Sequence, residues 1–347
     1  MENIVQKAVR IALNKKLSFH ERHEYQVSKI LKNIEPERGT LSKQLIGECD
    51  DYAIEILGDK KYAPWLYVYS AIAGQFKQGW IPDNFYGSQV VPNVNGHYGA
   101  CASLKPLNTI FFQAKEFPDL GSFVNGFFLD RFHQVHPAKN FMEILFRDCN
   151  RIIFKADKSL KGKGIYFFDR TSFNVECFEH LGNGIFQSYI EQHSLFSEYT
   201  PQSVATIRIT TVIDDEGKVS ARGSYLRLGA EHDTHVQSAS SVSIPIDLVT
   251  GALSDTGYMP SWITTRSHPA SRKEFADVKI PDFRKCVNVV TSLHLKVPFV
   301  RCIGWDVTLD KEGEVVVLEW NGGHNGIKFT EATQGPSFVD MGWEKFR

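Results

Sequence analysis

Apolar residues recur at helical spacing through the first part of the chain, with charged residues between them. One such pattern runs over residues 4–31 and a second over residues 51–76. Pro64 lies inside the second pattern, where a proline removes a helical hydrogen bond, so we expect two helices there. The pattern predicts a helical N-terminal region over residues 1–100.

The helical pattern weakens at Gly79 and Pro82, which are typical helix breakers. The segment that follows, residues 83–100, reads DNFYGSQVVPNVNGHYGA and is rich in Gly, Asn and Pro. This composition predicts a linker or an irregular surface segment.

From about residue 150 the pattern changes to short β-rich segments joined by tight turns. The expected strands are residues 151–157, 164–170, 203–214, 218–229, 302–309 and 314–321. Asp-Glu-Gly at 215–217 and Asp-Lys-Glu-Gly at 310–313 predict two β-hairpins. A helix is expected over residues 281–295. Helices followed by antiparallel hairpins indicate an α+β fold rather than a doubly wound parallel sheet.

Composition narrows the class of protein. The 347 residues include 42% hydrophobic and 23% charged residues, which is typical of globular proteins, and the net charge of −1 does not favour nucleic acid as a partner. The N-terminus has no signal-peptide pattern, and no window reaches the ~18 apolar residues of a membrane span. The six cysteines form no CxxC pair, which favours reduced thiols and a cytoplasmic protein.

A loop rich in lysine and glycine joins the first two expected strands. Lys155 ends one strand, and Ser159, Gly162, Lys163 and Gly164 lie in the loop before the next. Glycines allow the backbone to approach phosphate oxygens closely, and lysines neutralise their charge. The loop is no Walker A motif, because a strand follows it instead of GK[ST] and a helix. It is either a flap that closes over a triphosphate or an ordinary basic β-turn.

The last expected hairpin carries acidic residues that suit a metal site. Glu319 and Asn321 are two apart in a strand and therefore share a face, and Asp306 can lie beside them on the paired strand. Two carboxylates and an amide oxygen are hard ligands that suit Mg²⁺. The alternative is a polar row facing solvent, which the flanking Trp305 and Trp320 disfavour.

A mid-strand arginine is a candidate phosphate ligand. Alternation in ATIRIT places Thr206, Arg208 and Thr210 on one face and the two isoleucines on the other. Arg208 can then hold a transferring phosphate, or it can form a cross-strand ion pair on a solvated face. Local sequence supports both interpretations equally.

Together these segments resemble the ATP-grasp superfamily, and more narrowly its sugar-transfer associated family from bacterial capsule and exopolysaccharide gene clusters. The motifs are IIFKAD…KGKGI, GIFQSYI, TIRITTV and GWDVTL…VVLEWN, in this order. The segment YAPWLYVYSAIAGQFKQGWIPDNFYG is also similar to that family, and the resemblance runs over about residues 50–335.

The resemblance implies a role for each candidate residue and two α+β lobes that grip ATP. The implied nucleotide ligands are Lys155, the loop residues Ser159, Gly162, Lys163 and Gly164, and the hinge residues Gln187, Tyr189, Ile190 and Glu191. Arg208 and Lys163 would be catalytic, and Asp306, Glu319 and Asn321 would hold magnesium. A helical region over 1–100, a lid lobe over 101–190 and a C-terminal lobe over 191–347 are the implied domains. Residues 233–243 depart from the family pattern, which leaves the acceptor undetermined.

The resemblance implies a ligase that uses Mg²⁺ and ATP to join a carboxylate to an amine through an acyl phosphate. A sugar acid or nucleotide sugar in polysaccharide biosynthesis is the expected substrate class, while the oligomeric state stays undetermined. Two alternatives remain, a phosphotransferase that acts on a hydroxyl group and a non-catalytic nucleotide-binding scaffold.

Overall fold

The computed structural model of the protein describes residues 18–157, 164–230 and 240–347. The chain forms two compact units. Unit 1 consists of Met1–Asn93, Ser261–Ile263 and Gly326–Arg347, and unit 2 consists of Val94–Pro260 and Thr264–Asn325. The last 22 residues of the chain thus pack with the N-terminal helices, which the local sequence pattern does not show.

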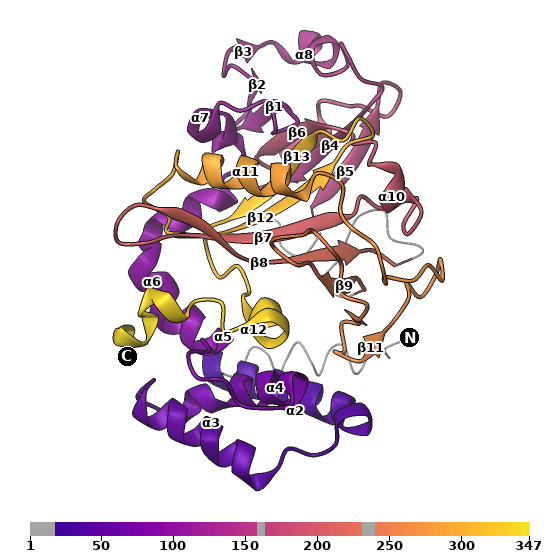
Figure 1. Ribbon diagram of the computed structural model, residues 1–347. Helices are drawn as coiled ribbons and strands as arrows, with labels where there is room; N and C mark the ends of the chain where they lie inside the picture. Colours follow the sequence, from indigo (N-terminus) through magenta and orange to yellow (C-terminus); the bar gives the residue numbers. More distant parts are fainter. Residues whose placement is uncertain (1–17, 158–163, 231–239) are drawn as a thin grey trace. The chain divides into compact units, whose positions relative to one another are not determined.

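Unit 1 is helical. Its longer helices are α2 (Phe19–Arg38), α3 (Lys43–Glu55), α4 (Ala63–Ala73) and α12 (Lys328–Gln334) (Figure 1). Ser18 and Glu21 form a capping box that satisfies free N–H groups at the start of α2. Pro64 lies in the first turn of α4, where no backbone donor is lost, so it begins this helix as expected. No helix in the described part of the chain is long and apolar enough to cross a membrane.

The segment expected to be a linker is instead a run of short helices, so that prediction was wrong. The helices are α5 (Asp83–Phe85), η2 (Tyr86–Val90, a π-helix), α6 (Val91–Val94) and η3 (Gly96–Ser103). Pro82 precedes the first helix instead of interrupting one. Phe85, Tyr86 and Val90 are buried, so burial of these apolar residues outweighs the low helix propensity of the Gly and Asn residues.

Unit 2 contains a six-stranded antiparallel sheet in the order β3-β2-β1-β6-β4-β5. The strands are β1 (Asp119–Val124), β2 (Phe127–Asp130), β3 (Val135–His136), β4 (Arg151–Ala156), β5 (Ile165–Asp169) and β6 (Gly184–Ser188). Phe154 and Phe186 on one face pack in an aromatic core with Phe141 of α8 (Ala138–Leu145) and Phe178 of α9 (Cys177–Leu181). The opposite face carries Lys155 and other polar residues.

The second sheet of unit 2 has seven antiparallel strands in the order β11-β10-β9-β8-β7-β12-β13. The strands are β7 (Thr206–Ile213), β8 (Val219–Leu228), β9 (Val242–Pro245), β10 (Gly257–Tyr258), β11 (Thr264–Thr265), β12 (Cys302–Leu309) and β13 (Val315–Asn321). Helix α11 (Phe283–His294) packs on its apolar face, against residues such as Ile209 and Trp305 (Figure 1). The other face carries the polar residues of β7, β12 and β13.

Both predicted hairpins are present, joining β7 to β8 and β12 to β13. Gly217 and Gly313 each have a φ of 81°, a conformation that residues with a Cβ rarely adopt, so glycine is required at both turns. The remaining short helices are η1 (Lys60–Tyr62), η4 (Lys105–Leu107), α7 (Asn108–Phe112), α10 (Ser194–Ser197), η5 (Val339–Met341) and η6 (Trp343–Phe346). The antiparallel sheets with helices on their faces confirm the predicted α+β class.

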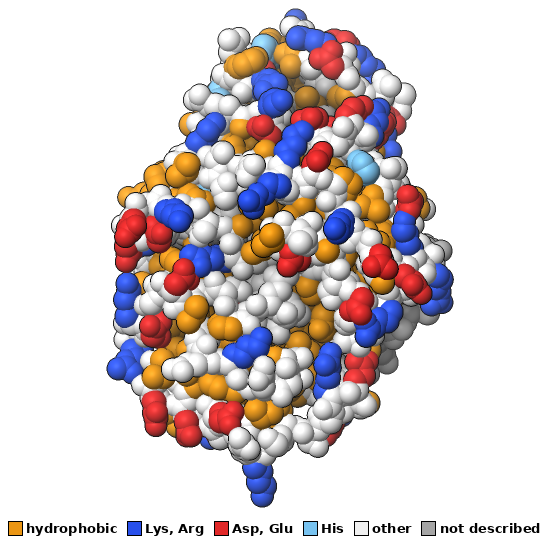
Figure 2. All heavy atoms as spheres, in the orientation of Figure 1, with side chains coloured by type: hydrophobic (Ala, Val, Ile, Leu, Met, Phe, Trp, Pro, Cys, Tyr) orange, Lys and Arg blue, Asp and Glu red, His pale blue; other side chains and the backbone are white. Residues whose placement is uncertain are grey.

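Surface charges of both signs are mixed. Figure 2 shows lysine and arginine side chains interspersed with aspartate and glutamate over the face drawn. This distribution agrees with the net charge of −1.

Candidate functional site

A row of charged residues crosses three neighbouring strands of the seven-stranded sheet. Arg208 in β7 lies opposite Asp306 in β12, and Asp306 lies opposite Glu319 in β13. Residues directly opposite each other in antiparallel strands project to the same face. Asn321 lies on this face too, opposite Gly304. The register therefore brings together the four residues that strand alternation selected.

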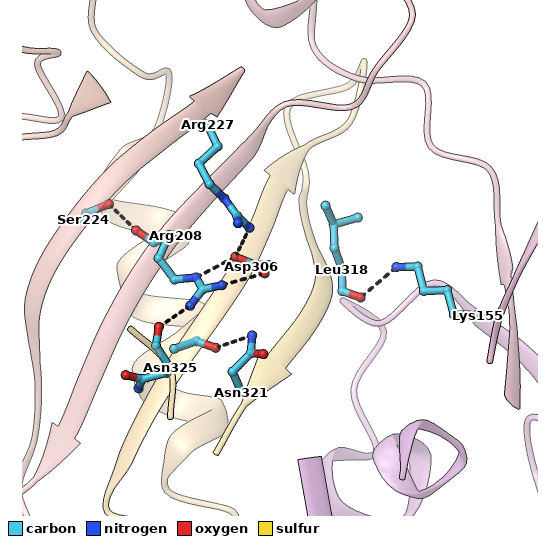
Figure 3. Close-up of polar contacts among 9 residues, drawn as sticks. Lys155, Arg208, Ser224, Arg227, Asp306, Leu318, Asn321 and Asn325 are labelled. Carbon is cyan, nitrogen blue, oxygen red and sulfur yellow. Dashed lines mark hydrogen bonds and ion pairs between the residues drawn. The ribbon is translucent and has the colours of Figure 1, made fainter. Parts of the chain in front are cut away.

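Asp306 is held by two arginines (Figure 3). Arg208 donates from Nε to Oδ1 at 2.7 Å and from Nη2 to Oδ2 at 3.0 Å, and Arg227 donates to Oδ1 at 2.8 Å. All three side chains are largely buried. Burial alone would raise the pKa of Asp306, but the charges of Arg208 and Arg227 hold that pKa below its ordinary value.

Arg208 therefore forms the cross-strand ion pair that was one of its two expected roles, but on a buried face. Burial opposes its charge, yet the neighbouring Asp306 keeps the pKa of Arg208 above its ordinary value. The guanidinium also donates from Nη1 to the Asn325 carbonyl at 2.9 Å. A Cβ added to Gly304 would lie 2.8 Å from Nη1, so glycine leaves the room that the guanidinium occupies. Its role as a phosphate ligand stays a prediction.

Lys155 reaches the same hairpin from the six-stranded sheet. Its Nζ donates to the Leu318 carbonyl at 3.0 Å (Figure 3). Leu318 is the extra residue of a β-bulge, because Asp306 pairs with Glu319 whereas Val307 pairs with Val317. Burial lowers the pKa of Lys155, although the charges of Glu319 and Asp119 act in the opposite direction. The lysine is thus close to the acidic residues of the row.

The three predicted metal ligands differ in their present contacts. The Asp306 carboxylate accepts from the arginines, whereas the Glu319 side chain forms no hydrogen bond or ion pair with any described residue. Asn321 donates from Nδ2 to the Gly304 carbonyl at 3.2 Å, which turns its amide oxygen away from that carbonyl. Two carboxylates and one amide oxygen on one face fit the preference of Mg²⁺ for oxygen ligands. Within the described ranges, no three His, Cys, Asp or Glu side chains cluster as a metal-binding group.

The predicted hinge residues begin with Gln187 near the end of β6 and continue in the segment after it. The Gln187 amide donates to Asp119 at 2.6 Å, and Arg151 lies 4.3 Å above the Tyr189 ring. Ile190 is buried. Glu191, expected as a nucleotide ligand, is paired with Lys311 at 2.6 Å, and its carbonyl accepts from the Lys311 backbone N–H. The segment after β6 therefore runs beside the β12–β13 turn.

The predicted flap is described only at its ends. Ser159, Gly162 and Lys163 lie outside the described residues, as does most of the divergent segment at 233–243. Gly164 has a φ of 75°, and its carbonyl accepts a hydrogen bond from the Ala156 N–H. This bond closes the hairpin between β4 and β5 at the base of the loop.

The sequence analysis missed Arg227, Asp119 and Lys105, which are all largely buried near the row. Strand alternation could have identified Arg227. It lies two residues after Tyr225 in β8, and Tyr225 lies opposite Arg208, so Arg227 shares the face of Arg208. Lys105 affects the pKa of Lys155 through its charge, yet it lies in a segment without strand periodicity. Nothing in its local sequence marks it as a site residue.

Residues 177–342 match the model of the sugar-transfer associated ATP-grasp family. This match agrees with the family predicted from the motifs. The matched segment includes Arg208 and the three predicted metal ligands, and Lys155 precedes it. No curated protein matches the chain.

Solved structures with similarity to the chain include three enzymes. One is the biotin carboxylase domain of Hydrogenobacter thermophilus 2-oxoglutarate carboxylase, with 13% identity over 75% of this chain and 45% of that chain and a TM-score of 0.40. Another is Thermotoga maritima N5-carboxyaminoimidazole ribonucleotide synthetase, with 11% identity over 79% of this chain and 61% of that chain and a TM-score of 0.39. The third is Coxiella burnetii D-alanine-D-alanine ligase, with 13% identity over 73% of this chain and 60% of that chain and a TM-score of 0.42. The chain thus spans less than two thirds of the length of each.

Proposed function

We propose that the protein is a Mg²⁺- and ATP-dependent carboxylate–amine ligase that acts through an acyl phosphate. The observation that carries the proposal is the row of Arg208, Asp306 and Glu319 on one sheet face. Arg227 and Lys155 lie beside this row. Cations and carboxylates arranged in this way suit a polyphosphate held together with a divalent cation. The ATP-grasp class supports the same proposal.

The described residues would bind and orient the reacting groups. Lys155 would exchange the Leu318 carbonyl for a phosphate oxygen, since both are hydrogen-bond acceptors in reach of Nζ. Arg208 and Arg227 would balance negative charge on the transferring phosphoryl group while Asp306 keeps their guanidinium groups in place. Magnesium bound by Asp306, Glu319 and Asn321 would neutralise phosphate charge.

The reaction would proceed in two transfers. A carboxylate oxygen of the substrate attacks the γ-phosphorus of ATP, the bond to the β–γ bridging oxygen breaks, and ADP leaves. An amine then attacks the acyl carbon, inorganic phosphate leaves, and the nitrogen loses a proton to give the amide. The reaction needs no nucleophile from the protein, because catalysis consists of positioning and charge stabilisation.

The remaining predicted elements would complete the nucleotide site. Gln187, Tyr189, Ile190 and Glu191 would receive the adenosine, and the loop at 158–164 with Ser159, Gly162, Lys163 and Gly164 would close over the phosphates. In this proposal the six-stranded sheet belongs to the lid lobe of residues 101–190, and the whole seven-stranded sheet belongs to the C-terminal lobe of residues 191–347. The family description supports a sugar acid or nucleotide sugar as the acid substrate.

An ADP-release screen with uronic acids and amino compounds tests the reaction class. With hydroxylamine replacing the amine, a ligase gives a hydroxamate and free phosphate, because hydroxylamine captures an acyl phosphate. A stable phosphorylated acceptor without phosphate release would instead establish the phosphotransferase. Absence of Mg²⁺-dependent ATP turnover across the whole panel would favour the nucleotide-binding scaffold.

Two variants link any turnover to the proposed site. Asp306→Asn and Asn321→Ala each remove one predicted metal ligand and should abolish ADP release while the circular dichroism spectrum stays unchanged. The control is Arg170→Gln, which breaks an exposed pair with Glu143 and a hydrogen bond to the Phe146 carbonyl but touches none of the predicted metal ligands. This variant should retain full turnover. Full activity in either site variant would refute the metal assignment.

A further inference from the structure

A buried carboxylate and a buried amide form a pair on the Lys155 face of the six-stranded sheet. The Nε2 of Gln187 donates to Oδ1 of Asp119 at 2.6 Å, and the two residues are 2% and 3% exposed. Asp119 begins β1 and lies directly opposite Gln187 in β6. The pair does not take part in the charged row described above.

A β-bulge places Asp119 on this face. Gly121 pairs with Phe186, whose ring belongs to the aromatic core, while Asp119 pairs with Gln187, so Leu120 is the extra residue. Without the bulge, strand alternation would put residue 119 on the same face as residue 121, the face of the aromatic core. The bulge therefore turns the carboxylate to the face of Gln187 and Lys155.

The carboxylate fixes the orientation of the amide. Burial raises the pKa of Asp119 to about 6, so the carboxylate is mainly ionised at neutral pH and only accepts hydrogen bonds. Gln187 must therefore present its Nε2 to Asp119, which directs Oε1 away from it. Oε1 accepts no hydrogen bond from a described residue. Oδ2 of Asp119 is buried without a hydrogen bond of standard geometry to a described residue, although the Asn108 side chain is close enough to lower the pKa of Asp119.

We infer that Asp119 is a positioning residue that holds the Gln187 carbonyl oxygen ready to accept a hydrogen bond from the 6-amino group of a bound purine. This inference rests on the proposed nucleotide site at Gln187. An oxygen acceptor at this position matches the amino group of adenine and repels the 6-oxo group of guanine or hypoxanthine. Asp119 would thereby determine which nucleoside triphosphate the protein uses.

The test compares the dissociation constants of ATP and ITP, which differ in the purine ring only at position 6 and the neighbouring N1 proton. The wild-type protein should bind ATP about tenfold more tightly than ITP, the effect of roughly one hydrogen bond. In Asp119→Asn the new amide can either accept from Gln187 or donate to it. The Gln187 amide can then rotate by 180°, and the ratio of the ITP and ATP dissociation constants should fall toward one. Gln187→Met, which lacks the acceptor, should behave in the same way.

The double variant Asp119→Asn/Gln187→Glu exchanges the carboxylate and the amide between the two positions. It tests whether the preference for ATP can be restored. A carboxylate at position 187 presents an acceptor oxygen in either orientation, so the preference for ATP should return. A wild-type ratio in Asp119→Asn, equal weakening of both nucleotides, or no rescue would overturn the inference and leave the ligase proposal standing. If the wild-type protein bound no nucleotide, the proposed function itself would fail, and this inference with it.

Discussion

Asp306 accepts three hydrogen bonds from two arginine side chains that belong to neighbouring strands. A buried carboxylate is costly unless charged partners surround it, and here Arg208 and Arg227 provide them. The same arrangement keeps two guanidinium groups fixed on the face that carries Glu319. At the scale of single residues, the ion pair therefore holds two guanidinium groups in fixed positions on this face.

Removal of Arg208 should destabilise unit 2 strongly. In Arg208→Ala the buried Asp306 loses its bidentate hydrogen bonds to the guanidinium group. Breaking such a buried ion pair costs about 3–5 kcal/mol of unfolding free energy. Urea unfolding followed by tryptophan fluorescence measures the loss. Arg301→Ala is the matched control, because its partner Asp215 is exposed, and its effect should be much smaller. Equal losses in both variants would contradict this account.

The sequence predicts these residues to different extents. Alternation alone put Thr206, Arg208 and Thr210 on one face, and the tight turn of the last hairpin made the pairing of Asp306 with Glu319 possible. Asp119 was not predictable, because its face depends on a bulge, and a one-residue shift reverses the direction of a side chain. Long-range pairing, rather than local propensity, decides such positions.

At the scale of elements, a chain of hydrogen bonds fixes α11 on the seven-stranded sheet. Trp305 donates to the Thr211 hydroxyl, which contacts Nδ1 of His294 at 2.6 Å, and Nε2 of His294 contacts the Val300 carbonyl at 2.7 Å. A carbonyl only accepts, so Nε2 carries a proton. Burial lowers the pKa of His294 and favours the neutral ring, in which Nδ1 accepts from the Thr211 hydroxyl. The ring is therefore held in its neutral form.

This arrangement predicts acid sensitivity. Burial lowers the pKa of His294 from 6.5 to about 4, so the unfolded chain binds a proton more readily. Stability should therefore fall as the pH drops from about 6.5 toward 4, by up to about 3 kcal/mol. In His294→Gln this part of the pH dependence should disappear from urea unfolding curves. An unchanged slope between these pH values would show that other groups cause it.

The expected elements agree with the structure wherever periodicity and turn residues act together. The hairpins at Gly217 and Gly313 and the helix over 283–294 were predicted closely. Residues 83–100 were not, because Gly, Asn and Pro indicate loops locally while buried Phe85 and Tyr86 pack the segment as helix. Tertiary burial overrode the local preference there.

At the scale of the whole molecule, the C-terminal residues Gly326–Arg347 belong to unit 1 together with the N-terminal helices. Trp343 is 2% exposed and stacks on Phe338 at 4.7 Å within unit 1, where Tyr86 also contacts it. Trp343→Ala should cost about 3–5 kcal/mol through loss of buried contacts. Hydrogen exchange should then accelerate in α4 of the same unit but stay unchanged in β12. Equal acceleration in both would mean that the two units unfold together.

The central claim is that Asp306, Glu319 and Asn321 bind magnesium together with ATP. Calorimetric titration of a non-hydrolysable ATP analogue, with and without Mg²⁺, tests it most directly in the wild type and in Glu319→Gln. The wild-type protein should bind the analogue about tenfold more tightly with Mg²⁺, and Glu319→Gln should lose this dependence because a ligand charge is removed. Equal strengthening by Mg²⁺ in both proteins, or none in the wild type, would contradict the claim.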